Sequence, residues 1–203
     1  MDLQLDETNS TACAGKRGVD DAFASALWGL DWLFTSVDLG FCRINLHMDN
    51  AAYSAVFVTS TRTSTGVHYA NRISPLYYAM YMFTHAINHR ILPTTIATSA
   101  NIKAYAVRSS NVGPVKLFVI NKDLSAFGTV FITTSKPMHQ ASLLILQAPA
   151  LGATSGVTYG GQSFDNYTGL IGTVQTTSFS PDSNGKYSFD LPSAAAVLLT
   201  INP

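Results

Sequence analysis

Charged residues are scarce in this sequence: they make up 12% of its 203 residues, and the two signs cancel at pH 7. It contains no basic patch and no run of like charge, so there is no electrostatic reason to expect nucleic acid or an anionic membrane as a partner. No apolar stretch reaches the roughly 20 residues that span a bilayer. We therefore expect no membrane span. The hydrophobic content of 47% is ample for a packed core.

Cysteine is also rare. Cys13 and Cys42 are too few for a disulfide framework, and metal-binding spacings such as CxxC are missing. We expect two free, buried thiols. His85 and His89 have the i, i+4 spacing of a helical metal pair, but no third ligand accompanies them, so no metal site is predicted. Serine hydrolase, dinucleotide and phosphate-loop motifs are missing too, and we expect no cofactor.

The first part of the chain alternates strand-like and helical patterns, which is typical of βα units on a parallel sheet. We expect strands at residues 2–7 and 41–47. Apolar residues at three-and-four spacing predict a helix over 19–34, and Ser74-Pro75 predicts the start of another that runs to about residue 89. We interpret residues 48–71 as a long loop that forms a wall of a binding cleft.

The second part has short β-branched and aliphatic runs separated by turn residues, which predicts an antiparallel β-sandwich. We expect its strands at residues 102–108, 115–121, 129–134, 142–147, 187–191 and 196–201. The predicted fold class is therefore α/β plus all-β. Residues 1–95 would form the α/β part, and residues 96–203 would be the sandwich.

Glu7 is the one glutamate of the sequence, and it stands at the end of a predicted strand, where (β/α) barrels expose catalytic side chains. Taken alone, it could equally be a solvated carboxylate near a terminus.

Four segments carry a resemblance to glycoside hydrolase family 79, the family of β-glucuronidases and heparanase: ETNS (7–10), GKRGV (15–19), DAFASALWGLD (21–31) and INLH (44–47). Residues 157–161 and 194–201 resemble parts of the β-sandwich that follows the barrel in this family. The resemblance implies that residues 1–95 are the last two βα units of a TIM-type barrel, and that Glu7 ends the seventh strand of this barrel and is the catalytic nucleophile. It also implies that the eighth strand ends in His47.

Retaining hydrolysis needs a second carboxyl group about 5 to 5.5 Å from the nucleophile. In the family this is a glutamate after an asparagine on the fourth strand, and no Asn-Glu pair occurs here. We therefore expect the isolated chain to be inactive and to be part of a longer parent that supplies the remaining barrel. Asp49 lies past the eighth strand, but nothing in the sequence places it opposite Glu7.

Asn9, His47, Asp49 and Tyr53 are the candidate substrate-binding residues. In the family, glycine amides and a tyrosine after the eighth strand hold the uronate carboxylate. Tyr53 could be that tyrosine, but the glycines are missing, which leaves the choice between uronides and neutral sugars open. His47 could contact the sugar, orient Glu7 or simply be a histidine of the core.

The alternative function is a non-catalytic sandwich that braces an enzyme or binds carbohydrate through exposed aromatic side chains. The candidates for such a surface are Tyr105, Phe131, Tyr159 and Phe179. Trp28 and Trp32 are expected to pack in the core. Carbohydrate is the expected partner in either case. Sequons at Asn9 and Asn166 suit an extracellular or secreted parent, although this chain begins without a signal peptide.

Overall fold

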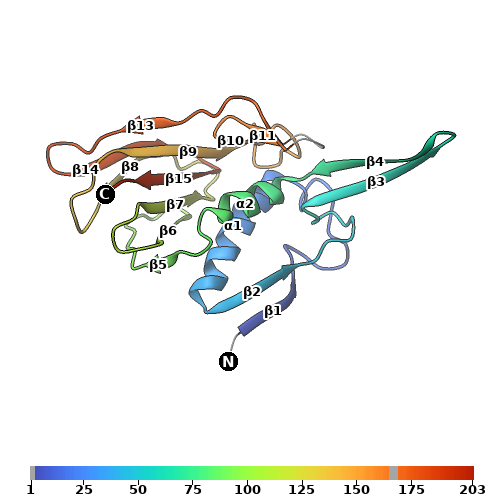
Figure 1. The fold of residues 1–203 in the computed structure, drawn as a ribbon, viewed down its shortest axis with the longest axis horizontal. Helices are drawn as coiled ribbons and strands as arrows, with labels where there is room; N and C mark the ends of the chain where they lie inside the picture. Colours follow the sequence, from blue (N-terminus) through green and yellow to red (C-terminus); the bar gives the residue numbers. More distant parts are fainter. Residues whose placement is uncertain (1–2, 165–168) are drawn as a thin grey trace.

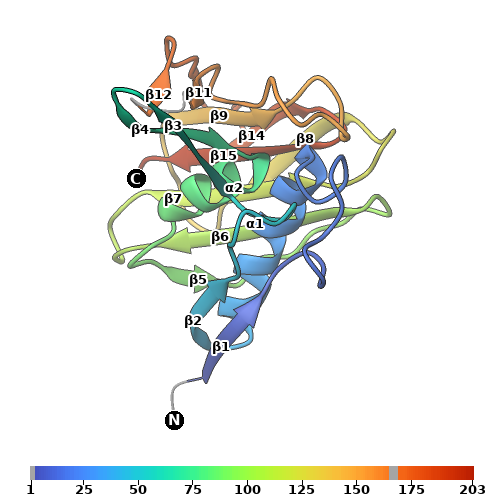
Figure 2. The same ribbon diagram turned by 90° about the vertical axis from the view of Figure 1, so that its right-hand side faces the viewer.

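The computed structural model describes residues 3–164 and 169–203 (Figures 1 and 2). A βαβ unit begins the chain: β1 (Leu3–Thr8) and β2 (Phe41–Leu46) pair in parallel, and α1 (Phe23–Asp38) connects them. This arrangement confirms the predicted βα pattern. Within the described residues, no helix is both long and apolar enough to cross a membrane.

Helix α1 begins at Phe23 rather than at the predicted residue 19. Its first amides are satisfied from a distant part of the chain, because the Phe23 and Ala24 N–H groups donate to the carbonyls of Ala153 (2.8 Å) and Leu151 (2.9 Å). The N-terminal amides of a helix lack partners within the helix itself. The loop at residues 151–153 therefore fixes where α1 begins.

The predicted loop over residues 48–71 is wrong, since most of it is a β-hairpin of β3 (Val56–Thr63) and β4 (Gly66–Ile73). The hairpin projects away from the rest of the molecule (Figure 1). Its strands are rich in Thr and Val, which favour extended backbone, and Gly66 has the positive φ (136°) that the turn requires. The pattern was missed because few of these residues are large and apolar.

Helix α2 (Pro75–Thr84) starts where Ser74-Pro75 predicts but ends five residues early. The following residues form turns, and Ile87 among them is exposed. The Ser74 hydroxyl donates to the carbonyl of Ser54 (2.7 Å) instead of capping the helix.

The six predicted sandwich strands are all present and antiparallel to their neighbours, within one residue of the predicted bounds. A seven-stranded sheet has the order β10-β9-β15-β7-β6-β5 with β13 also on β9, and a two-stranded sheet joins β14 to β8. The strands are β5 (Arg90–Leu92), β6 (Ile102–Arg108), β7 (Val115–Asn121), β8 (Gly128–Thr133), β9 (Ala141–Gln147), β10 (Thr158–Tyr159), β13 (Thr177–Phe179), β14 (Lys186–Leu191) and β15 (Ala195–Ile201); a separate pair is β11 (Ser163–Phe164) and β12 (Leu170–Ile171).

The large sheet is the middle layer of three. On β7, Phe118 and Ile120 pack against the two helices, while Leu117 and Val119 pack against the β8–β14 layer. Central strand β15 is apolar almost throughout because it is covered on both faces. Strand β5 belongs to this sheet, although it lies before the division that we predict at residue 95.

Two further expectations need correction. Cys13 and Cys42 are free thiols, as predicted, but both are exposed, since Cys13 lies on the loop after β1 and Cys42 on an outer strand. Trp28 and Trp32 stack on each other with ring centroids 6.0 Å apart, and both are half-buried rather than part of either core. The sequon at Asn166 lies outside the described residues.

Candidate active site

The candidate site lies where β1 and β2 end. The strands are parallel, so their carboxyl ends lie at one edge, and the His47 amide extends the pairing by donating to the Thr8 carbonyl (3.0 Å). Glu7 stands at this edge with 71% of its side chain exposed. A carboxylate and an imidazole therefore lie together at the strand ends, the edge of a (β/α) barrel that bears catalytic side chains.

The His47 ring lies between two carboxylates. Its Nδ1 is 3.0 Å from Oε1 of Glu7, and its Nε2 is 3.3 Å from Oδ2 of Asp49. The ring also meets Tyr53 edge-on, with centroids 5.7 Å apart. A protonated imidazole could donate to both carboxylates at once. Because Glu7 and Asp49 contact opposite nitrogens of one ring, that ring separates them.

Asn9 links the loop after β1 to the loop after β2 through hydrogen bonds. Its Nδ2 donates to the carbonyls of His47 (2.8 Å) and Tyr53 (3.2 Å), and its Oδ1 accepts from the Ser10 amide (2.8 Å). The side-chain amide of Asn9 is therefore engaged within the site, where it fixes the backbone that carries His47 and Tyr53.

Tyr53 is a buried member of the site. Burial raises the pKa of its hydroxyl, and the nearby negative charge of Asp49 adds to this effect, with a smaller contribution from Glu7. Its ring is edge-on to His47. The five residues proposed from the sequence, Glu7, Asn9, His47, Asp49 and Tyr53, thus form one connected cluster.

Two aspartates that support this cluster were not identified as site residues. Asp20 is buried and accepts hydrogen bonds from the Ser10 hydroxyl (2.7 Å) and the Lys16 amide (2.6 Å). Asp21 is buried beside it and accepts from the Gly18 amide (2.6 Å). Both precede α1 and organise the turn after β1. The glycines at 15 and 18 followed by two aspartates were the available signal for such a turn.

Other titratable residues lie away from the cluster. The carboxylate of Asp31 accepts a hydrogen bond from the Tyr105 hydroxyl (2.6 Å) and pairs with the Lys122 ammonium, so it joins α1 to the sandwich. Burial, together with this bond to Asp31, raises the pKa of Tyr105 to about 12. The His85 ring packs against the rings of Tyr81 and Tyr159, and the Lys116 ammonium donates a hydrogen bond to the His85 carbonyl. Among residues 3–164 and 169–203, no three His, Cys, Asp or Glu side chains could hold a metal ion together.

The four aromatics considered as a carbohydrate-binding surface do not form one. Phe131 on β8 is 73% exposed, whereas Tyr159 is buried. Tyr105 and Phe179 are half-buried, the first against Phe34 and the second against Tyr187. Phe131 alone among these four is mostly exposed, so the four side chains do not present one surface of aromatic rings.

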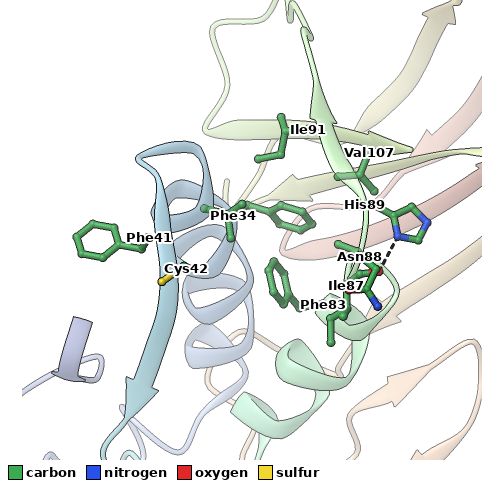
Figure 3. Close-up of a pocket in the computed structure, with 11 residues that line it drawn as sticks. Phe34, Phe41, Cys42, Phe83, Ile87, Asn88, His89, Ile91 and Val107 are labelled. Carbon is green, nitrogen blue, oxygen red and sulfur yellow. Dashed lines mark hydrogen bonds between the residues drawn. The ribbon is translucent and has the colours of Figure 1, made fainter. Parts of the chain in front are cut away.

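Two cavities border α2, one at the opposite end of β2 from this cluster and one that reaches Met48 beside His47. The first, of about 290 Å³, lies between the end of α1, the start of β2 and the turn after α2. Phe34 and Phe83 face each other in it, and the sheet contributes Ile91 and Val107 (Figure 3). A more open groove of about 510 Å³ runs between β2 and α2 and reaches Met48. Both are lined mainly by apolar side chains and contain none of the five cluster residues.

Comparisons with known proteins agree with the architecture. The family described as the glycosyl hydrolase family 79 C-terminal beta domain matches residues 104–198. A β-glucuronidase of Neurospora crassa is 37% identical over 64 residues, which are 31% of this chain and 11% of that protein.

Solved structures cover nearly the whole chain. The 4-O-α-L-rhamnosyl-β-D-glucuronidase of Fusarium oxysporum superposes with a TM-score of 0.74 and 22% identity over 97% of this chain and 43% of that enzyme. A family 30 endoxylanase of Clostridium papyrosolvens superposes with a TM-score of 0.59 and 13% identity over 100% of this chain and 42% of that one. The chain thus spans less than half the length of these relatives. Together, the fold and the comparisons support a C-terminal part like that of a glycoside hydrolase family 79 enzyme, comprising the end of the barrel and the β-sandwich that follows it.

Proposed function

We propose that this chain supplies the nucleophile of a retaining glycoside hydrolase that acts on β-glucuronides or related glycosides. The observation that carries the proposal is the exposed carboxylate of Glu7, fixed 3.0 Å from His47 Nδ1 at the carboxyl end of β1. Likeness to a β-glucuronidase and to a rhamnosyl-glucuronidase supports a glucuronide as the substrate.

In the proposed reaction the Glu7 carboxylate attacks the anomeric carbon, and the bond from that carbon to the leaving oxygen breaks. A second carboxylic acid protonates the leaving oxygen. Water then attacks the glycosyl ester, gives its proton to the second carboxylate and releases Glu7. The hydrogen bond from His47 would orient Glu7 for attack, and Asp49 would hold the opposite side of the imidazole.

Asp49 is a poor candidate for the second carboxyl group, because the His47 ring stands between it and Glu7. A (β/α) barrel has eight strands and this chain contributes two. We therefore assign the acid/base carboxyl group to the remainder of the barrel in a longer parent, and we expect the chain alone to be inactive.

A chimera tests this assignment. Residues 1–203 would replace the aligned C-terminal part of the Fusarium oxysporum enzyme, and hydrolysis of a chromogenic β-glucuronide would be measured. We expect Glu7→Gln to lower kcat by on the order of 10³-fold or more, and Asp49→Asn to have a smaller effect. Substantial turnover by the Glu7→Gln chimera would refute the nucleophile assignment.

A further inference from the structure

Two arginines converge on one aromatic ring at the base of the β3–β4 hairpin. The guanidinium carbon of Arg17, from the turn after β1, is 4.2 Å from the centroid of Phe57, and that of Arg72, on β4, is 4.0 Å from it. Phe57 and Arg72 are cross-strand partners, and the ring is buried. Stacking on an aromatic face fixes the plane of a guanidinium while leaving its N–H edge accessible.

Both guanidiniums share a single carboxylate. Arg17 Nη1 is 3.4 Å and Arg72 Nη2 is 3.3 Å from the same oxygen of Asp21. These contacts are longer than the roughly 2.7–2.9 Å of strong charge-assisted hydrogen bonds, and neither is bidentate. The three groups together carry one net positive charge. Asp21 therefore positions the arginines without neutralising both of them.

The arginines keep donors for a ligand. A guanidinium has five N–H groups. Within the described residues, Arg72 uses Nη2 alone, and Arg17 uses Nη1 for Asp21 and Nη2 for the carbonyl of Asn50 (3.2 Å). The side chains are 55% and 41% exposed, so solvent reaches the unused donors.

This pair lies at the rim of the candidate active site. Arg17 bonds the carbonyl of Asn50, which directly follows Asp49, and Asp49 contacts the same imidazole as Glu7. Asn50 also fixes the hairpin base, because its side chain bonds both the amide (2.8 Å) and the carbonyl (3.1 Å) of Val58. The loop after β2 that carries Asp49 is therefore linked both to Arg17 and to the base of the hairpin that carries Arg72.

We propose that Arg17 and Arg72 form a carboxylate-binding site for a uronic acid unit of the substrate. A planar fork that is already fixed in place suits bidentate recognition of a carboxylate and loses little freedom on binding. The position beside Glu7 rests on the proposed function, whereas the binding of a carboxylate sugar does not.

The test is a titration of the chain with sodium D-glucuronate, followed by nuclear magnetic resonance of the backbone amides and the arginine Nε–H groups. We expect saturable shifts at Arg17 and Arg72 with glucuronate and none with D-glucose at the same ionic strength. Sodium acetate should compete, because the shared chemistry is a carboxylate. The titration measures binding and not turnover, so its outcome does not depend on whether Glu7 is the nucleophile.

The arginine variants decide the assignment. Arg17→Gln and Arg72→Gln should each weaken glucuronate binding at least about tenfold, the loss expected for one charged hydrogen bond. Arg62→Gln is the matched control: it removes the same charge from the exposed part of the same hairpin and should bind normally. If Arg72→Gln unfolds, Arg72→Lys keeps the charge without the fork and should still weaken binding. Unchanged affinity in folded Arg17 and Arg72 variants, or an equal loss in Arg62→Gln, would overturn the proposal and leave the pair as a brace of the hairpin.

Discussion

Gly15 lies in the turn after β1, where a side chain would be crowded by its neighbours. Replacing Gly15 by alanine tests how closely Asp20 and Tyr53 pack against this turn. Its φ of +67° is in the left-handed region. A Cβ there would lie 2.9 Å from Oδ2 of Asp20, 3.0 Å from the Tyr53 ring and 3.2 Å from the Thr11 hydroxyl. Gly18 has a similar φ of +78°, but a Cβ there would have nothing within 4 Å. The two glycines therefore separate backbone strain from steric crowding.

The expected magnitudes differ accordingly. Alanine in the left-handed region costs about 1–2 kcal/mol, and both variants should lose roughly this much stability. Gly15→Ala should lose about 1–3 kcal/mol more, because the new methyl group overpacks against Asp20 and Tyr53. For a chain of 203 residues the extra loss corresponds to a Tm lower by roughly 2–12 °C.

Thermal and urea unfolding of Gly15→Ala, Gly18→Ala and the parent chain, followed by circular dichroism, would measure this difference. The resonances of Tyr53 and His47 should shift in Gly15→Ala and stay in place in Gly18→Ala. Equal stabilities for the two variants would show that the turn relaxes around the methyl group. That result would refute the argument that the lack of a side chain at Gly15 is needed for Asp20 and Tyr53 to keep their positions.

Four other outcomes follow from particular contacts. Tyr105→Phe should lower the free energy of unfolding, measured with urea, by about 1.5–3 kcal/mol, because it removes the hydroxyl that donates to Asp31. Tyr77→Phe is the control and should change this free energy little, because the Tyr77 side chain has no hydrogen bond within the described residues. Burial, followed by the charge of Lys116, lowers the pKa of His85, so its neutral form is favoured in the folded chain. Stability, measured by urea unfolding, should therefore fall as pH drops below the unfolded value of about 6.5, and His85→Gln should reduce this dependence. Asn9 should remain unmodified in a glycosylating host, by mass spectrometry of its peptide, because its amide is bound to His47 and Tyr53. Both thiols should react with a disulfide reagent in the folded chain; slow reaction of either would contradict their exposure.

The sandwich strands could be predicted because their patterns are local. The runs at residues 117–120 and 195–199 are continuous and apolar, and the structure buries them on both faces of the sheet. The short strands β5 and β10 to β13 could not be predicted, because two or three residues carry no periodicity of their own. Their pairing depends on the longer strands beside them.

The candidate cluster could be predicted from the sequence for another reason. Parallel strands place their carboxyl ends together, so Glu7 and His47 had to lie near each other once both strands were identified. The role of Asp20 was not accessible, because its bonds to Ser10 and Lys16 depend on a turn with left-handed residues. The hairpin that brings Arg72 to Arg17 was likewise hidden, since its strands lack an apolar pattern.

The sandwich also bears on the geometry of the candidate site. Helix α1 follows the turn that carries Asp20 and Asp21, and its position is set at two points by the sandwich: its first amides bond to residues 151–153, and Asp31 bonds to Tyr105 and Lys122. A shift of α1 along its axis would move the turn and, through Asp20 and Ser10, the backbone next to Asn9. Asn9 in turn holds the carbonyl of His47, whose ring contacts Glu7. The sandwich therefore fixes the position of α1 and, through the turn before α1, the ends of β1 and β2. Replacing Asp31 should displace His47, although no contact joins the two side chains within the described residues.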